Sequence, residues 1–134
     1  MKLKILDIDS NAAKPKATIH ITGKLGFNME ASKMMDLSDE TYYQVAIDEE
    51  TEAADTIYFI PATADIKGSV KVAKAGSYFY MNLGATFNKL ELNYEKHIIS
   101  FDISKTKYEG EDLFVLKKRK RQKLRDGAND KDDD

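Results

Sequence analysis

An internal repeat limits what this chain can fold into more than any other feature. Residues 45–60 read "VAIDEETEAADTIYFI" and residues 101–116 read "FDISKTKYEGEDLFVL". The two segments align without a gap, which places Phe59 on Val115. In both copies apolar runs flank a polar, acidic middle, a pattern typical of two β-strands joined by a loop. A chain that repeats such a unit is expected to fold as two similar halves.

A second matching block lies upstream in each copy. It reads "GKLGFNMEASKMMDL" over residues 23–37 and "GSYFYMNLGATFNKLEL" over residues 76–92. Asn28 and Asn82 occupy equivalent places, each before a short run of apolar residues with helical spacing. Asparagine is a preferred N-cap because its side chain accepts hydrogen bonds from the unpaired amides of the first turn. Each copy is therefore predicted to begin a short helix there.

A further strand is predicted before each block, over "KATIHIT" (16–22) and "SVKVAKA" (69–75). The repeating unit is then strand, strand, helix, strand, strand, over about 16–61 and 69–118. We predict an α+β protein of two tandem β-β-α-β-β units related by a pseudo-twofold axis, with antiparallel four-stranded sheets and two short helices. One domain is expected over residues 1–121, and the alternation of Leu3 and Ile5 with charged residues in 1–10 is compatible with an added edge strand.

Composition excludes several classes of site and protein. The 134 residues fit one domain, and the absence of cysteine excludes disulfides, thiolate metal sites and thiol nucleophiles. His20 and His97 lie in different predicted strands without an acidic partner motif, so we expect no zinc and no other cofactor. No catalytic motif, signal peptide or membrane span is recognisable, which favours a non-catalytic cytosolic, nuclear or viral protein, away from membranes.

Charge is strongly polarised at the C-terminal end, although the formal net charge is only −2. Residues 117–125 contain seven of the 21 lysines and arginines, and residues 126–134 contain five aspartates and one lysine. Residues 122–134 are predicted to form a disordered acidic tail. Such a tail either keeps the protein soluble or competes with a polyanion for the cationic run, which would make it autoinhibitory.

The order of elements resembles the single-stranded-DNA-binding transcriptional regulator fold of the Whirly and Pur-alpha families, in which two copies of a four-strand-plus-helix unit pack together. The stretches "GKLGFNMEASKMMDLSDETYYQVAID" and "DTIYFIPA" are also similar to small uncharacterised proteins of gut bacteria and their phages. The chain lacks the lysine-rich strand motif of Whirly proteins, so the resemblance assigns no binding residue. The first of these stretches also resembles the hairpin-helix unit of AbrB-like regulators, but the proline expected after its strand is absent.

The strand "GSYFYMN" holds the best candidates for stacking on unpaired bases. Because side chains alternate along a strand, Tyr78 and Tyr80 share one face and Phe79 and Met81 share the other. If the second pair faces the core, two phenol rings stand on the outer face, where we expect Lys71 and Lys74 beside them. The alternative is a cross-strand aromatic contact that only stabilises the sheet. In "TYYQVAID", Tyr43 is predicted to face the core.

The cationic run supplies the other candidate contacts. Positive charges close together in sequence repel one another, which favours a polyanion as their partner. The predicted nucleic-acid-binding residues in this run are Lys117, Lys118, Arg119, Lys120 and Arg121.

Together these features predict a protein that binds single-stranded DNA or RNA through a sheet face and a basic segment. The alternative is a structural or protein-interaction module, such as a phage or host scaffold. A sequence-specific duplex-binding regulator is a third hypothesis. Homo-oligomer formation is compatible with all three.

Overall fold

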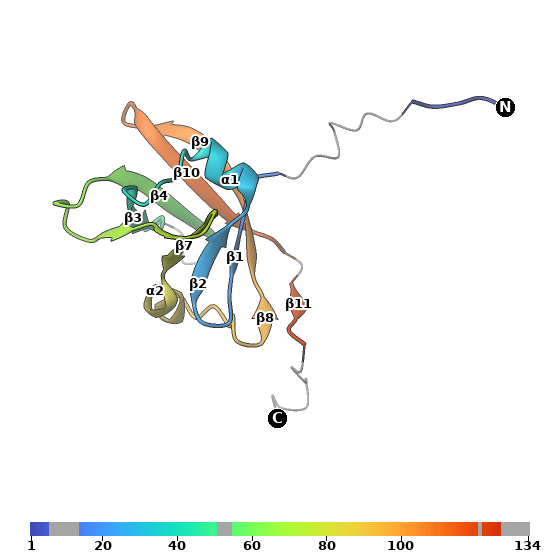
Figure 1. Cartoon of the computed structure of the whole chain (residues 1–134). Helices are drawn as coiled ribbons and strands as arrows, with labels where there is room; N and C mark the ends of the chain where they lie inside the picture. The colour runs from blue at the N-terminus through green and yellow to red at the C-terminus, as the bar shows by residue number, and fades with distance from the viewer. Residues whose placement is uncertain (6–13, 51–54, 121, 127–134) are drawn as a thin grey trace.

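The computed structural model describes residues 1–5, 14–50, 55–120 and 122–126 and confirms an α+β fold, one that consists mostly of β-strands with two short helices (Figure 1). The first half contains β1 (Lys16–Ile19), β2 (Lys24–Phe27), α1 (Met29–Met34), β3 (Tyr42–Ala46) and β4 (Thr56–Ala62). The second half contains β5 (Ser69–Lys71), β6 (Ala73–Ala75), β7 (Tyr78–Asn82), α2 (Gly84–Lys89), β8 (His97–Ile98), β9 (Ser100–Tyr108) and β10 (Glu111–Lys118). A short strand, β11 (Lys123–Leu124), follows.

The predicted pair of four-stranded sheets is wrong. Within the described residues, the strands of both halves form one nine-stranded antiparallel sheet in the order β5-β3-β4-β10-β9-β1-β2-β7-β6. Strands of the two halves are interleaved: β1 pairs with β9 of the second half, and β3 pairs with β5 of the second half. The equivalent strands β4 and β10 pair with each other, as do β2 and β7. Strands that the repeat predicted to be equivalent therefore pair with each other inside one shared sheet.

Residues 69–75 bring the two edges of this sheet together. The terminal strands β5 and β6 are consecutive in the chain and are separated by Val72 alone. The first pairs with β3 and the second with β7, so one extended segment changes partner at Val72. Val72 is fully buried, and its N–H donates to the carbonyl of Thr41 at 2.8 Å. The result is a nearly closed barrel, which leaves few unpaired strand edges.

The interior of the barrel is filled by aromatic and aliphatic side chains from opposite walls. Phe59 of β4 is fully buried and packs edge-on against Phe27 of β2, with ring centroids 6.3 Å apart. Three strands separate β4 from β2 in the sheet order, so this contact crosses the barrel. Tyr43 also contacts Phe59 and is 2 % exposed, which confirms its predicted core position.

The gapless alignment of the two copies is wrong by one residue in the last strand. Phe59 faces the interior, whereas Val115, its predicted equivalent, is half-buried on the outer face. The inward positions of β10 are Phe114 and Leu116, which are 4 % and 0 % exposed. Because side chains alternate with a period of two, a shift of one residue moves each side chain to the other face.

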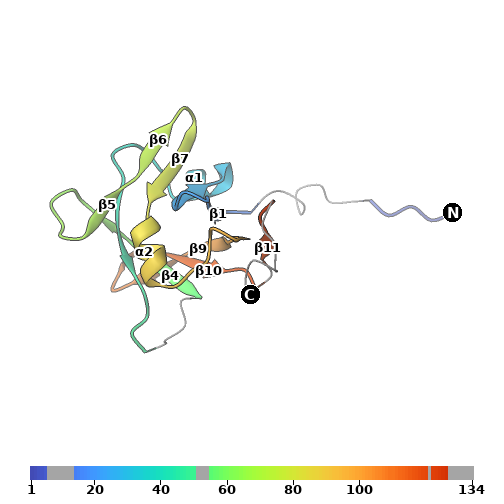
Figure 2. The same cartoon turned by 90° about the horizontal axis from the view of Figure 1, so that it is seen from below.

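α1 and α2 lie at opposite ends of the barrel (Figures 1 and 2). α1 directly follows β2, and α2 directly follows β7. Because β2 and β7 are antiparallel neighbours, their carboxyl ends point in opposite directions. Asn28 caps α1 as predicted, since its side chain accepts from the amide of Ala31 at 2.9 Å. Asn82 is not the cap of α2: it ends β7, and Leu83 occupies the N-cap without a side-chain hydrogen bond.

Part of the predicted disordered tail is folded. Residues 122–126 lie against the barrel, and Lys123–Leu124 pair with His97–Ile98 as β11 and β8. The sequence did not reveal this strand because its neighbours are cationic rather than alternating apolar residues. Residues 127–134 lie outside the described residues.

Residues 1–5 are exposed and form no strand, in contrast to the edge strand considered for 1–10; residues 6–10 of that segment lie outside the described residues. Among the described residues, no helix has the length and apolar character that a membrane span requires.

We predict that Phe59→Ala lowers the free energy of unfolding by about 3–5 kcal/mol, because it removes the contact across the barrel and leaves a cavity. Ile66→Ala is the control, since Ile66 is 41 % exposed in the β4–β5 loop and its loss is expected to cost less than about 0.5 kcal/mol. Urea denaturation measures both. Equal losses for the two variants would contradict a barrel closed around Phe59.

Candidate nucleic-acid interface

Tyr78 and Tyr80 form a pair of stacked rings on the outer face of β7. Their centroids are 6.1 Å apart and their planes differ by 22°. Met81, one position further along, is fully buried on the other face, so the predicted division of this strand into two faces is confirmed. We call Tyr78 and Tyr80 the tyrosine platform. Tyr78 is 37 % exposed and Tyr80 is half-buried.

A glycine in the neighbouring strand makes room for the platform. Gly26 of β2 lies opposite Tyr80 in the ladder. A Cβ atom at Gly26 would lie 1.5 Å from the Oη atom of Tyr78, so the phenol ring occupies the space that a side chain would take. An isolated glycine inside a strand often marks the close approach of another group. Gly26 was therefore a signal in the sequence for a neighbouring ring, and our sequence interpretation did not use it.

His20 fixes the far end of the Tyr78 ring. Its Nε2 atom lies 2.6 Å from the Tyr78 hydroxyl, and the two rings meet edge-on with centroids 6.0 Å apart. Burial raises the pKa of the Tyr78 phenol above its usual value, so the ring stays neutral at physiological pH. A neutral, anchored ring that exposes part of its surface is suited to stacking without a large cost in side-chain entropy.

Lys24 supplies the positive charge next to the platform. Its Nζ atom lies 4.8 Å from the centroid of the Tyr80 ring, within the range of a cation–π interaction. Lys24 is exposed and belongs to β2, whose outer face is continuous with that of β7. An ammonium group beside an aromatic ring can contact a phosphate while a base stacks on the ring.

The structure does not bring the two expected lysines to the platform. Lys74 pairs with Phe79 in the β6–β7 ladder and holds its Nζ atom 5.8 Å from that ring, on the side opposite the tyrosines. Lys71 lies in β5, which pairs with β3 and places Lys71 opposite Tyr42. The segment 69–75 changes its pairing partner between these two lysines. The sequence prediction assumed that the whole segment pairs with β7 as a hairpin, so it placed both lysines beside the tyrosines.

The cationic run begins at the end of β10, and two of its members are already paired. Lys118 lies 3.3 Å from the carboxylate of Asp55, and Arg119 lies 2.9 Å from that of Asp102. Surface ion pairs of this kind contribute little to stability, so both cations can exchange partners. A hollow of about 530 Å³ next to them is lined by Asp55, His97, Lys117, Lys118, Lys120 and Gln122. Arg121 lies outside the described residues.

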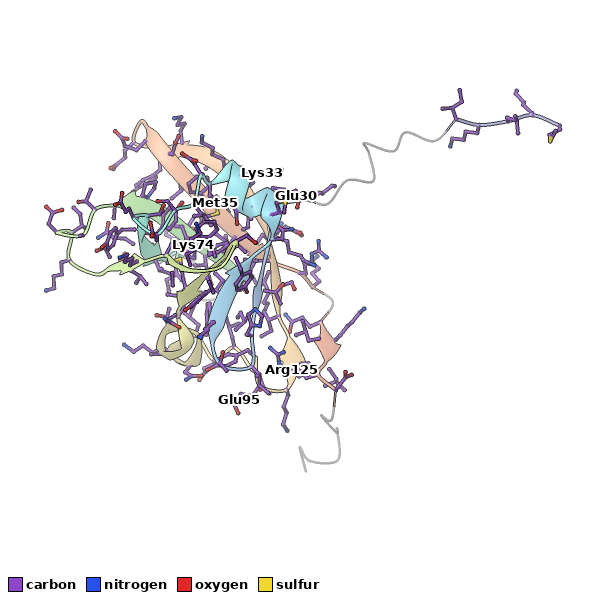
Figure 3. The ribbon with its side chains drawn as sticks, in the orientation of Figure 1. Glu30, Lys33, Met35, Lys74, Glu95 and Arg125 are labelled. Carbon is purple, nitrogen blue, oxygen red and sulfur yellow. The ribbon has the colours of Figure 1, made fainter. Side chains whose placement is uncertain are left out.

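Arg125 holds the end of this segment against the barrel. Its Nε atom donates to the carbonyl of Tyr94 at 2.5 Å, and a terminal guanidinium nitrogen donates to the carbonyl of Ile19 at 2.6 Å. Ile19 directly precedes His20, which contacts Tyr78. Figure 3 shows Arg125 near Glu95, at the end of the barrel away from Glu30 of α1. Arg125 therefore holds the last described residues of the chain next to the end of β1, directly before His20.

The described residues hold no cluster of three or more histidine, cysteine or acidic side chains that could bind a metal ion. Comparison with protein-family models, with curated proteins and with solved structures found no match.

We predict that Gly26→Ala displaces the Tyr78 ring and lowers the pKa of its phenol towards the ordinary value of a tyrosine, because the partial burial that raises this pKa is lost. The matched control is Gly84→Ala, where the nearest atom to a Cβ lies at 3.5 Å, an ordinary contact. NMR titration of ring-labelled tyrosine follows the signal. An unchanged Tyr78 signal in Gly26→Ala would show that the glycine does not position the ring.

Proposed function

We propose that this protein binds single-stranded DNA or RNA without catalysis, through the tyrosine platform and the cations around it. The observation that carries the proposal is the stacked, partly exposed pair Tyr78 and Tyr80 with the Lys24 ammonium over one ring. Unpaired bases stack on aromatic rings whatever their identity, and cations neutralise the phosphates that connect them. Duplex DNA keeps its base faces covered, so the platform favours single strands.

The sheet geometry supports binding across neighbouring strands, because Tyr80, Gly26, Thr18 and Ser100 lie in one row of the ladder. The outer faces of β7, β2 and β1 are contiguous, and Thr18 and Ser100 carry hydroxyl groups on the next positions of this surface, 3.0 Å apart. Hydroxyls and ammonium groups are common partners of phosphate and sugar oxygens. The surface therefore offers aromatic rings for stacking on β7 and hydroxyl groups for polar contacts on the neighbouring strands.

The cationic segment adds sequence-independent affinity. Lys117 and Lys120 are exposed at the end of β10, and Lys118 and Arg119 gain a phosphate in place of a carboxylate. Each phosphate neutralised on a single strand releases counterions, so affinity falls as salt rises. In this proposal, the resemblance to Whirly and Pur-alpha proteins reflects a shared mode of binding, and the protein acts in the cytoplasm of a bacterial or phage-infected cell.

A salt titration of binding to fluorescent single-stranded and duplex oligonucleotides tests the proposal. We expect preference for the single strand and a steep loss of affinity with salt. Absence of binding at low salt would overturn it and favour the protein-interaction module.

Replacing both rings of the platform should weaken binding to single strands. Tyr78→Ala and Tyr80→Ala are each expected to cost about 1–3 kcal/mol of binding free energy if each ring stacks one base. Tyr42→Ala is the matched control, because Tyr42 is half-buried like Tyr80 and lies in β3, on a different part of the barrel. Fluorescence anisotropy measures affinity, and thermal melting checks that each variant is folded. Unchanged affinity of the double variant would assign the rings a purely structural role.

Removing residues 127–134 tests whether the acidic residues compete with nucleic acid. The deletion keeps Arg125 and its hydrogen bonds to the barrel. If the aspartates compete, the truncated protein binds more tightly, with the largest gain at low salt because salt screens the competition. A variant with Asp130, Asp132, Asp133 and Asp134 replaced by asparagine separates charge from length. Equal affinity of the truncated and full-length proteins at low salt would exclude autoinhibition.

A further inference from the structure

A second surface lies on the outer face of β3, β4 and β10, and the proposed function does not use it. It is a groove of about 690 Å³, and we call it the apolar groove. Its lining includes Ala46 and Tyr58, which face each other in the β3–β4 ladder, together with Ile60 and Leu113. Ile47 and Tyr108, which also line it, are 47 % and 56 % exposed. Exposed apolar side chains gathered around a hollow mark an interaction site rather than scattered surface residues.

The charge around the groove is negative. Asp48, Glu49 and Glu50 form part of its lining, and Glu109 follows Tyr108 at the β9–β10 turn. Lys105 and Lys107 share the carboxylate of Asp112, at 3.5 and 2.6 Å, so this nearby cluster offsets one of the four acidic charges. A polyanion would be repelled here, so the groove favours an apolar ligand that also carries positive charge.

One segment of this chain has that chemistry. Residues 1–5 read "MKLKI", so apolar and cationic side chains alternate. In an extended backbone the apolar side chains share one face and the lysines the other. Leu3 and Ile5 are 82 % and 94 % exposed, and Figures 1 and 2 show residues 1–5 extended away from the barrel.

We propose that residues 1–5 of one copy bind in the apolar groove of a second copy. Leu3 and Ile5 would enter the groove against Tyr58 and Ile60, while Lys2 and Lys4 would lie beside the acidic residues of its rim. The partner is a second copy, because both views place residues 1–5 clear of the strands that carry the groove. Burial of these apolar side chains and opposite charges at the rim would together drive association.

Sedimentation velocity over a range of protein concentrations tests this inference. The wild type is expected to associate as concentration rises, and Leu3→Ser with Ile5→Ser should raise the dissociation constant at least about tenfold. In the groove, Ile47→Lys with Tyr108→Lys should have a similar effect, since both side chains are exposed and the new charges repel Lys2 and Lys4.

The control carries equivalent changes elsewhere on the surface. Ile21→Ser with Ile66→Ser removes apolar side chains that are 58 % and 41 % exposed but lie outside the groove. This variant should associate like the wild type. A comparable loss in the control would overturn the inference, because general surface apolarity would then explain association.

A mixing experiment identifies the contact directly. The variant with the altered segment retains its groove, and the variant with the altered groove retains its segment. Each should be monomeric alone, and a mixture of the two should form a heterodimer. A wild type that stays monomeric at all concentrations, or a mixture that does not associate, would overturn the inference. Cross-linking of residues 1–5 only to the groove of the same copy would also overturn it.

Discussion

The structure depends on the change of pairing partner at Val72. Residues 69–75 extend β3 on one side and β7 on the other, and the burial of Val72 fixes the point of exchange. Without this segment the sheet would end in two open edges, one beside β3 and one beside β7, with unpaired backbone groups. With it, the inner faces of both halves enclose a common interior, in which Phe27 and Phe59 meet across the barrel.

The candidate interface follows from the same closure. β7 lies between β2 and β6, so the outer face that carries Tyr78 has a neighbour on each side. Gly26 leaves space for the Tyr78 ring, and His20 holds its hydroxyl. The Lys24 ammonium lies beside Tyr80. The sequence had predicted Lys71 and Lys74 at this place, on the assumption that residues 69–75 form a simple hairpin with β7. The platform is thus assembled by residues from both halves of the repeat.

The two proposed binding surfaces have different charges beside them. The tyrosine platform lies beside Lys24, whereas the apolar groove is lined by Asp48, Glu49 and Glu50. A net charge of −2 conceals this separation. Electrostatic attraction and repulsion favour phosphates at the first surface and cationic segments at the second. Nucleic-acid binding and association between copies can therefore occur at different places on one barrel.

The sequence by itself determined the α+β class, the cap at Asn28 and the faces of β7, because all three depend on local periodicity and hydrogen bonding. Tertiary structure decided the rest. Which strands pair is a property of the whole chain, so the repeat did not show that the halves share a sheet. The neighbours of the tyrosines come from β1 and β2, far away in sequence. Arg125 likewise binds carbonyl groups that only the folded barrel brings within its reach.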